Sequence, residues 1–338
     1  MIPDQAEERT HIVPPALAGS RLDACVTALV AEVSRSAARR LIDDECVLLD
    51  GRAVKASTTV AAGQRIDVSI PAVEPIHIKP QEIPLDIAYE DDNVIVVNKP
   101  PGMAVHPGPG HPDGTLVNAL AAHCGKLSAA GGAHRPGLVH RLDLYTSGLI
   151  LCATNDRVHR ELSAAIERRE VKRLYEALVW EGPPQPAGRL TTRYGRRPEH
   201  RTLMAVLQEG GRKAITDYRV AERYGWRWTP PGERERAREA CCVVCGLQTG
   251  RTHQVRVHMQ HLGAPLIGDP EYGDLQRDAG GPEELDALVA ELPGQALHAV
   301  QIEFLHPVNG ETIRLNAAPP PQFAAVRDWL REHGHTPA

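Results

Sequence analysis

The segment GLVHRLDLYTSGLILCATN, residues 137–155, places one carboxylate between a polar loop and an apolar strand. Asp143 follows Arg141 and precedes a Thr-Ser-Gly turn at 146–148, after which the chain becomes apolar. An acid that acts on a substrate needs a loop for access and a rigid strand for support. Taken alone, Arg-x-Asp beside Thr-Ser-Gly is more often a turn with a local ion pair. The segment by itself therefore leaves a catalytic and a structural interpretation open.

The flanking sequence mixes strand and helix patterns. Residues 155–170 predict an amphipathic helix capped by Asn155. The strand pattern of 171–182 places Tyr175, Ala177 and Val179 on one face. Further segments predict strands at 93–100, 146–154, 239–248 and 298–307, and a helix at 252–263. Together they predict an α+β domain over residues 87–330, with a large mixed or mostly antiparallel sheet.

A smaller unit precedes this domain. Residues 1–17 are polar and without periodicity, so we expect a flexible tail. Residues 18–72 combine two short helix patterns, an Asp50-Gly51 hairpin signal and an alternating strand at 65–70. They predict a small α/β domain. The proline-containing stretch 73–86 predicts a linker between the two domains.

Composition excludes several classes of protein. The 338 residues are 42% hydrophobic and 24% charged, which argues against a disordered chain. The seven cysteines, an odd number, fit a reducing compartment better than a disulfide framework. No apolar run approaches the roughly 20 residues that span a bilayer, and the first residues lack a signal-peptide pattern. We expect a cytoplasmic protein with no membrane partner.

Charge is unevenly distributed along the chain. There are 38 basic and 43 acidic residues, a net charge of −5. Residues 189–219 carry eight basic and three acidic side chains, whereas 271–291 carry seven acidic side chains and one basic. Binding of a polyanion depends on where charges lie rather than on their sum. Charge alone favours a nucleic-acid surface no more than an ordinary solvated surface.

Longer motifs connect these segments. They are HRLDLYTSGL (140–149), VVNKPPGMAVHPG (96–108), GTLVNAL (114–120), RYGRRPEHRTLMAV (193–206), KAITDYRV (213–220), LQTGRTHQVRVHMQHLGAPLIGDPEYG (247–273) and LHAVQIEFLHPVNGE (297–311). In this order they resemble the sequence blocks of the RluA-type RNA pseudouridine synthases over most of residues 87–316. The unit at 18–72, with SRLD, SRSAARRLI and its Asp-Gly hairpin, resembles the S4-like RNA-binding domain that many members carry.

The resemblance implies an enzyme that isomerises uridine to pseudouridine within structured RNA, without cofactor or metal. It identifies Asp143 as the catalytic nucleophile or base and Arg251, from the GRTHQ block, as its charge partner. A guanidinium suits that position because burial alone would neutralise the acid. Tyr175 would stack on the target base, and Arg141 would displace the target nucleotide, which must leave its stack. The remaining predicted RNA-binding residues are Arg35, Arg39, Arg196 and Arg197.

Some features depart from the family pattern or suggest other classes. Leu144-Tyr145 and Thr154 stand where relatives often have Lys-Asp and lysine, which bears on the choice of substrate. The S4-like unit favours large-subunit ribosomal RNA, with transfer RNA as the alternative, and we expect a monomer. A catalytically inactive RNA-binding protein is a second alternative, but Asp143, Arg251 and Tyr175 are all present.

A metal enzyme is a further alternative. His253, His258 and His261 share a predicted helix, and Cys242 and Cys245 form a lone C-x-x-C. The histidine spacing differs from that of zinc proteases, and no second cysteine pair completes a tetrahedral site. A metal-dependent nuclease would need a cluster of carboxylates near Asp143, and the sequence has none there. We therefore expect no metal, with the cysteines packed in a strand.

Overall fold

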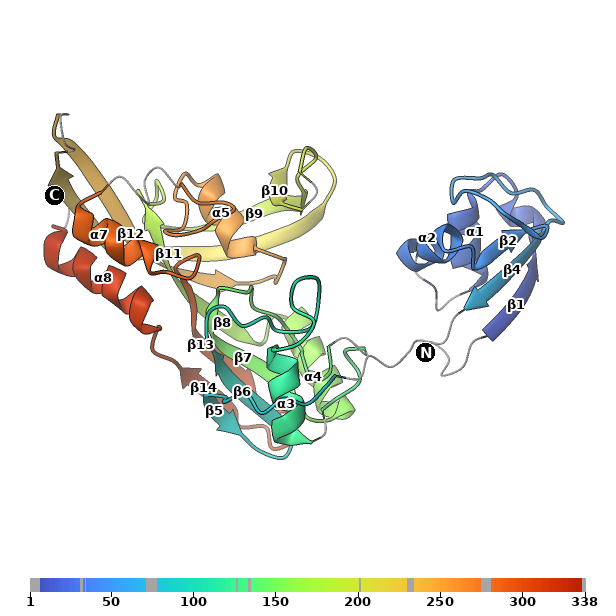
Figure 1. Ribbon diagram of the computed structural model, residues 1–338, viewed down its shortest axis with the longest axis horizontal. Coiled ribbons are helices and arrows are strands. Elements are labelled where there is room, and N and C mark those ends of the chain that lie inside the picture. The colour runs from blue at the N-terminus through green and yellow to red at the C-terminus, as the bar shows by residue number, and fades with distance from the viewer. Residues whose placement is uncertain are drawn as a thin grey trace. The chain divides into compact units, whose positions relative to one another are not determined.

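The computed structural model describes residues 7–30, 33, 35–70, 78–125, 127–132, 135–200, 202–229, 234–274 and 281–335. The chain divides into two compact units, Met1–His77 and Ile78–Ala338, which are considered separately below (Figure 1). The division falls within the predicted linker at 73–86, of which 73–77 lie outside the described residues.

The described part of that linker belongs to the second unit. Ile78 and Leu85 pack against the core of the larger unit. The side-chain carbonyl of Gln81 accepts a hydrogen bond from the backbone of Gly114 at 2.7 Å. The prediction of a linker over 78–86 was therefore wrong, because proline-containing segments also form fixed edges of a domain when their few apolar side chains are buried.

The N-terminal unit packs α1 (Leu22–Leu29) and α2 (Arg35–Asp43) against a four-stranded sheet. The strand order is β1 (Glu7–Ile12), β4 (Arg65–Ile70), β2 (Val47–Leu49) and β3 (Arg52–Ala53). Asp50 and Gly51 both have positive φ and form the predicted turn between β2 and β3. The apolar residues of both helices and of β2 and β4 make one buried cluster.

Strand β1 corrects the prediction of a flexible tail over residues 1–17. Glu7–Ile12 pairs antiparallel with β4 along its whole length, and Pro15–Leu17 forms a 3-10 turn, while residues 1–6 lie outside the described residues. A polar strand at a sheet edge is held by backbone hydrogen bonds. Such a strand needs no hydrophobic pattern, and the sequence therefore did not reveal it.

The predicted RNA-binding residues of this unit lie on α2. The side chains of Arg35 and Arg39 are 63% and 68% exposed. Arg35 is 3.6 Å from the carboxylate of Asp23, which is buried. Arg39 is 3.7 Å from the carboxylate of Asp43, which is exposed. Hydrogen bonds from Arg21 lower the pKa of Asp23 to about 2. The exposed arginines of α2 are thus held partly by acids of their own unit.

The described part of the second unit is built around a ten-stranded sheet. The prediction of a mixed or mostly antiparallel sheet is confirmed. Its order is β10 (Met204–Leu207), β9 (Ala187–Arg196), β11 (Arg212–Trp228), β12 (Arg236–Leu247), β8 (Lys172–Trp180), β13 (Leu297–Leu305), β7 (Ser147–Ala153), β6 (Val94–Lys99) and β5 (Ile87–Glu90), with β14 (Thr312–Asn316) paired to β13. The β13–β7 contact is parallel.

Helices cover both faces of this sheet (Figure 1). On one face, α3 (Leu116–Cys124) and α5 (Gln254–His261) pack on a cluster that includes Tyr175, Ala177 and Val179 of β8. On the other face lie α4 (Asp156–Glu167), α7 (Glu283–Ala290) and α8 (Pro321–His333). The alternation of side chains along β8 follows the predicted pattern.

Gly148, at the start of β7, lies where β13 crosses in parallel. Its φ is +105°, and an added Cβ would lie 2.4 Å from the carbonyl oxygen of Ala299. Gly148→Ala is therefore expected to destabilise the domain by about 3 kcal/mol, because backbone must move on both strands. Thermal unfolding of the two proteins measures this. Gly246→Ala on β12 is the matched control, since its Cβ would be 3.5 Å from Leu174 and its loss should be small; equal losses would contradict the argument.

No helix in the described ranges is both long and apolar enough to cross a membrane.

Candidate active site

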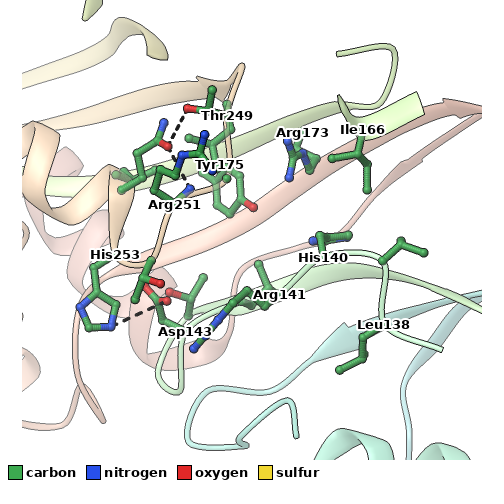
Figure 2. A pocket seen from close by; sticks show the side chains of 18 of the residues that line it. Leu138, His140, Arg141, Asp143, Ile166, Arg173, Tyr175, Thr249, Arg251 and His253 are labelled. Carbon is green, nitrogen blue, oxygen red and sulfur yellow. Dashed lines mark hydrogen bonds and ion pairs between the residues drawn. The ribbon is translucent and has the colours of Figure 1, made fainter. Parts of the chain in front are cut away.

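A cavity of about 520 Å³ lies on the face of the sheet that carries Tyr175 (Figure 2). Its walls come from the loop before β7 (138–143), the start of β8 and the loop between β12 and α5 (247–253). The cavity brings together four predicted residues: Asp143, Arg141, Tyr175 and Arg251. Arg196 and Arg197 lie at the hairpin between β9 and β10 and do not line it.

The loop that carries Asp143 is fixed from both sides. The backbone of Thr146 donates to the carbonyl of Asp143 at 3.2 Å, and the hydroxyl of Thr146 accepts from Gln295 at 3.1 Å. Ser147 lies 2.9 Å from Nδ1 of His298, whose Nε2 lies 3.0 Å from the carbonyl of Ala317. That ring therefore donates through Nε2 and accepts from the serine. The acid projects from a rigid support.

Lys99 ties this loop to the preceding strand. Its ammonium, completely buried at the end of β6, donates to the carbonyls of Pro100, Met103 and Leu144 at 2.8, 2.9 and 3.1 Å. Burial lowers the pKa of Lys99 to about 7, although the negative charge of Asp143 opposes the shift. The buried ammonium of Lys99 thus holds Leu144, the residue after Asp143, although Lys99 does not line the cavity.

The charge partner of Asp143 is Arg256, not Arg251. Nη1 of Arg256, on α5, is 3.9 Å from Oδ2 of Asp143. Its Nε and Nη2 donate to the fully buried carboxylate of Asp269 at 2.7 and 2.6 Å, and Nη2 also donates to Glu271 at 2.8 Å. Burial opposes the charged form of Arg256, but these acids raise its pKa above the ordinary value. The guanidinium is held from behind and presents one nitrogen to Asp143.

The predicted pairing of Arg251 with Asp143 is therefore corrected. Nε of Arg251 donates to the carbonyl of Lys213 at 3.3 Å, and the partners of Asp143 within 4.0 Å in the described ranges are His253 and Arg256. Arg251 still lines the cavity, on the wall across from Asp143 (Figure 2). Arg251 and Arg256 belong to one sequence motif, but the backbone turns at His253 between them, so that Arg256 approaches Asp143 and Arg251 contacts Lys213.

His253 forms that turn and approaches Asp143 from the other side. Its φ of +55° is left-handed, its Nε2 is 4.0 Å from Oδ1 of Asp143 and its Nδ1 is 3.0 Å from the hydroxyl of Tyr272. Burial lowers the pKa of His253, and the nearby carboxylate of Asp143 opposes the shift. The ring therefore fills the space beside the acid mainly as a neutral group.

Gln254 shapes the loop between β12 and α5. Its side-chain carbonyl accepts from the backbone of Arg251 at 3.0 Å and from Thr249 at 2.8 Å, while its amide donates to Ile215 and Thr216 of β11. Gln254 is buried, and its two bonds to β11 are shielded from water. The loop is therefore fixed relative to the sheet.

Tyr175 and Arg141 occupy opposite walls of the cavity (Figure 2). Tyr175 is 4% exposed, and burial raises the pKa of its hydroxyl, which stays protonated. Arg141 is exposed, and its guanidinium makes no hydrogen bond or ion pair with any residue that the structure describes. A buried aromatic ring and an exposed cation thus face one another across a cavity that the carboxylate of Asp143 also lines.

The metal alternatives have little geometric support. Within the described ranges, no group of three or more His, Cys, Asp or Glu residues could hold an ion. Cys242 and Cys245 lie in different core clusters, on opposite faces of the sheet. His258, a buried residue of α5, has Thr192 and Thr216 as hydrogen-bond partners. Both cysteines are thus packed in the core of the described sheet.

Two basic residues of the site were missed by the sequence analysis, Arg256 and Arg173. Arg256 lies in the predicted helix among apolar residues, and Arg173 lies two residues before Tyr175 on the same face of β8. The spacing of Arg173 to Tyr175 was a usable signal, because residues i and i+2 of a strand share a face. No comparable spacing pattern in the sequence indicated that Arg256 would be the charge partner of Asp143.

Comparisons with known proteins agree with this geometry. The family model for RNA pseudouridylate synthase matches residues 93–261, and that for the S4 domain matches residues 20–66. Ribosomal large subunit pseudouridine synthase D of Xanthomonas campestris is 42% identical over 327 residues, covering 96% of this chain and 93% of the relative. The protein of that name from Vibrio vulnificus is 39% identical over 336 residues, covering 98% of each.

Solved structures are similar in fold. Human RNA pseudouridylate synthase domain containing 1 superposes with a TM-score of 0.55 at 22% identity, covering 76% of this chain and 91% of the human one. The chain belongs to the RNA pseudouridine synthase family. It is an RNA-modifying isomerase with an N-terminal S4 RNA-binding domain. The family and both parts of the predicted architecture are thereby confirmed.

Proposed function

We propose that the enzyme isomerises specific uridines of large-subunit ribosomal RNA, with Asp143 as the acting carboxylate. The observation that carries the assignment is the position of Asp143: its side chain is 14% exposed in a cavity, 3.9 Å from the fixed guanidinium of Arg256. An acid shielded from water would otherwise lose its charge. Arg256 favours the ionised form, which is the form that acts as a nucleophile or a base.

The reaction needs no cofactor. Isomerisation breaks the glycosidic N–C bond, turns the uracil and forms a C–C bond to the same sugar, so nothing is oxidised or reduced. The residues around the cavity supply a carboxylate, a cation and an aromatic face, which are sufficient for this chemistry. We therefore propose cofactor-free and metal-free catalysis.

Two arguments support ribosomal RNA as the target. Relatives aligned over nearly the whole chain are named ribosomal large subunit pseudouridine synthases. The S4 domain adds an RNA-binding surface outside the catalytic unit, as a large structured RNA would require. Arg35 and Arg39 on α2, with Arg196 and Arg197 at the β9–β10 hairpin, are proposed to contact phosphates. Binding should then weaken as salt rises.

Mapping pseudouridine in cells that lack the gene tests this proposal. Chemical sequencing of ribosomal and transfer RNA is expected to reveal one or more missing pseudouridines in large-subunit ribosomal RNA, restored by the wild-type gene. Loss confined to transfer RNA would replace the proposed target by the alternative. An unchanged map in both RNAs, together with tight RNA binding by the purified chain, would favour the inactive RNA-binding protein.

Tyr175 is proposed to provide the surface on which the displaced uracil stacks. Tyr175→Leu is expected to reduce turnover about 10- to 100-fold, because base stacking on an aromatic ring contributes roughly 1–3 kcal/mol. Tyr175→Phe keeps the ring, so the difference between these variants measures stacking and any loss in the phenylalanine variant measures the hydroxyl. Single-turnover kinetics on a ribosomal RNA fragment would check it; equal rates for the leucine variant and the wild type would remove Tyr175 from the site.

A further inference from the structure

Arg173 is a buried cation that has no hydrogen-bond or ion-pair partner among the residues that the structure describes. It lies at the start of β8, is 5% exposed and lines the cavity. Its Nε is sealed from solvent and has no hydrogen-bond partner. In the described ranges, Arg173 and Arg256 are the two buried arginines, and of these Arg256 is satisfied by Asp269. A buried charge without compensation is costly to folding, so its retention calls for an explanation.

The neighbours of Arg173 do not supply a negative charge. Tyr175, two residues along the strand, stays protonated because burial raises its pKa. The pKa of His140 is lowered to about 3, by burial first and then by the charge of Arg173, so its ring is neutral. Glu167 stands exposed at the cavity lining and forms no ion pair with Arg173 in the described structure.

His140 adds a second unsatisfied donor at the same place. The backbone of Leu151 donates to its Nε2 at 3.0 Å, which leaves the proton on Nδ1, and this nitrogen is buried without a partner. Figure 2 places Arg173 beside Tyr175, with His140 on the facing wall. The corner of the cavity next to Tyr175 thus holds a guanidinium and a neutral imidazole, and no carboxylate of the described residues pairs with the guanidinium.

We propose that Arg173 binds a phosphodiester of the RNA strand, adjacent to the nucleotide whose uracil stacks on Tyr175. A guanidinium matches two oxygens of one phosphate, and the charge enters only with the substrate. Residues i and i+2 of a strand present side chains side by side, so one strand would hold the base and the adjoining backbone of the displaced nucleotide. This inference rests on the proposed function and adds a phosphate-binding residue to it.

The test combines a protein change with a change in one RNA phosphate. A methylphosphonate replaces one charged oxygen by a methyl group and is placed singly on the 5′ or the 3′ side of the target uridine. Arg173→Met is expected to weaken binding of unmodified RNA by the full chain about 10- to 100-fold, as for loss of a charged hydrogen bond. At one of the two positions, the methylphosphonate should weaken wild-type binding similarly and Arg173→Met binding less than about twofold.

Two further variants and one further measurement make the test more specific. Arg173→Lys should keep part of the affinity and of the methylphosphonate effect, since it keeps the charge without the fork. Arg314→Met is the matched control: Arg314 is an exposed arginine paired with Glu303, and its loss should leave the methylphosphonate effect at the wild-type value. Arg173→Met should also melt at a higher temperature than the wild type, whereas a structural arginine would lower it on removal.

The proposal is overturned if both methylphosphonates weaken Arg173→Met as much as they weaken the wild type. If Arg173→Met is poorly folded, the same comparison is made with Arg173→Lys, where an undiminished effect at both positions and an unchanged affinity overturn it. Affinity is measured separately from turnover. A wild type that binds RNA yet forms no pseudouridine would therefore contradict the proposed function while leaving the phosphate test intact.

Discussion

Asp143→Asn is expected to reduce pseudouridine formation by about 10⁴-fold or more, because the variant keeps the shape of the side chain and loses its negative charge. The carboxylate contributes little to the fold: in the described ranges its ion-pair contacts are the long ones to His253 and Arg256, at 4.0 and 3.9 Å. Thermal stability and RNA affinity should therefore stay close to the wild-type values. Single-turnover assays on the mapped ribosomal RNA fragment measure the rate.

Glu170→Gln is a matched control for this change. It also removes one carboxylate of the same domain, but Glu170 is exposed, pairs with Arg168 and does not line the cavity. Its rate should equal that of the wild type. A rate for Asp143→Asn within about tenfold of the wild type would show that another group performs the chemistry.

Arg256→Met is expected to lose both activity and stability. Without the guanidinium, Asp143 has no fixed cation, and the fully buried carboxylate of Asp269 loses the partner that satisfies both its oxygens. Breaking a buried ion pair on one side destabilises a protein by about 3–5 kcal/mol. Thermal unfolding measures the loss of stability, and turnover is measured well below the melting temperature of the variant.

A double variant separates the two effects. Arg256→Met with Asp269→Asn removes the orphaned charge, so it should recover part of the stability while turnover stays low. Arg251→Met tests the pairing that the family resemblance implied: because Arg251 contacts the carbonyl of Lys213 rather than Asp143, its loss should slow turnover less than that of Arg256. Full activity in the double variant, with an inactive Arg251→Met, would return the role of charge partner to Arg251.

The fold was largely predictable because its elements follow hydrophobic periodicity. The alternation of Tyr175, Ala177 and Val179 placed β8 correctly, and the Asp50-Gly51 pair placed the hairpin of the small unit. Strand β1 escaped prediction because an edge strand held by backbone bonds needs no apolar face. The proline content of 73–86 predicts a linker, but Ile78 and Leu85 pack against the core of the second unit, because prolines occur in fixed segments as well as in connections.

The residues that line the site could be predicted better than the contacts between them. Resemblance brought Asp143, Tyr175, Arg141 and Arg251 to one cavity, as the structure does. Which arginine faces the acid depends on the left-handed turn at His253, which starts α5 and sends the side chains before and after it in different directions. Backbone conformation at one residue has no clear sequence signal when that residue is not glycine. Arg173 has no partner among the described residues because no carboxylate lies within reach of its guanidinium, and the sequence gives no signal for such an arrangement.

The buried ammonium of Lys99 affects how the acidity dependence of this enzyme should be interpreted. Three carbonyls use all three of its N–H groups, and a neutral amine would turn a lone pair toward one of them. Since burial brings its pKa to about 7, rising pH removes this proton. A decline of rate on the alkaline side would then report the loss of the hydrogen bonds between Lys99 and these carbonyls, and would not identify a general acid that touches uridine.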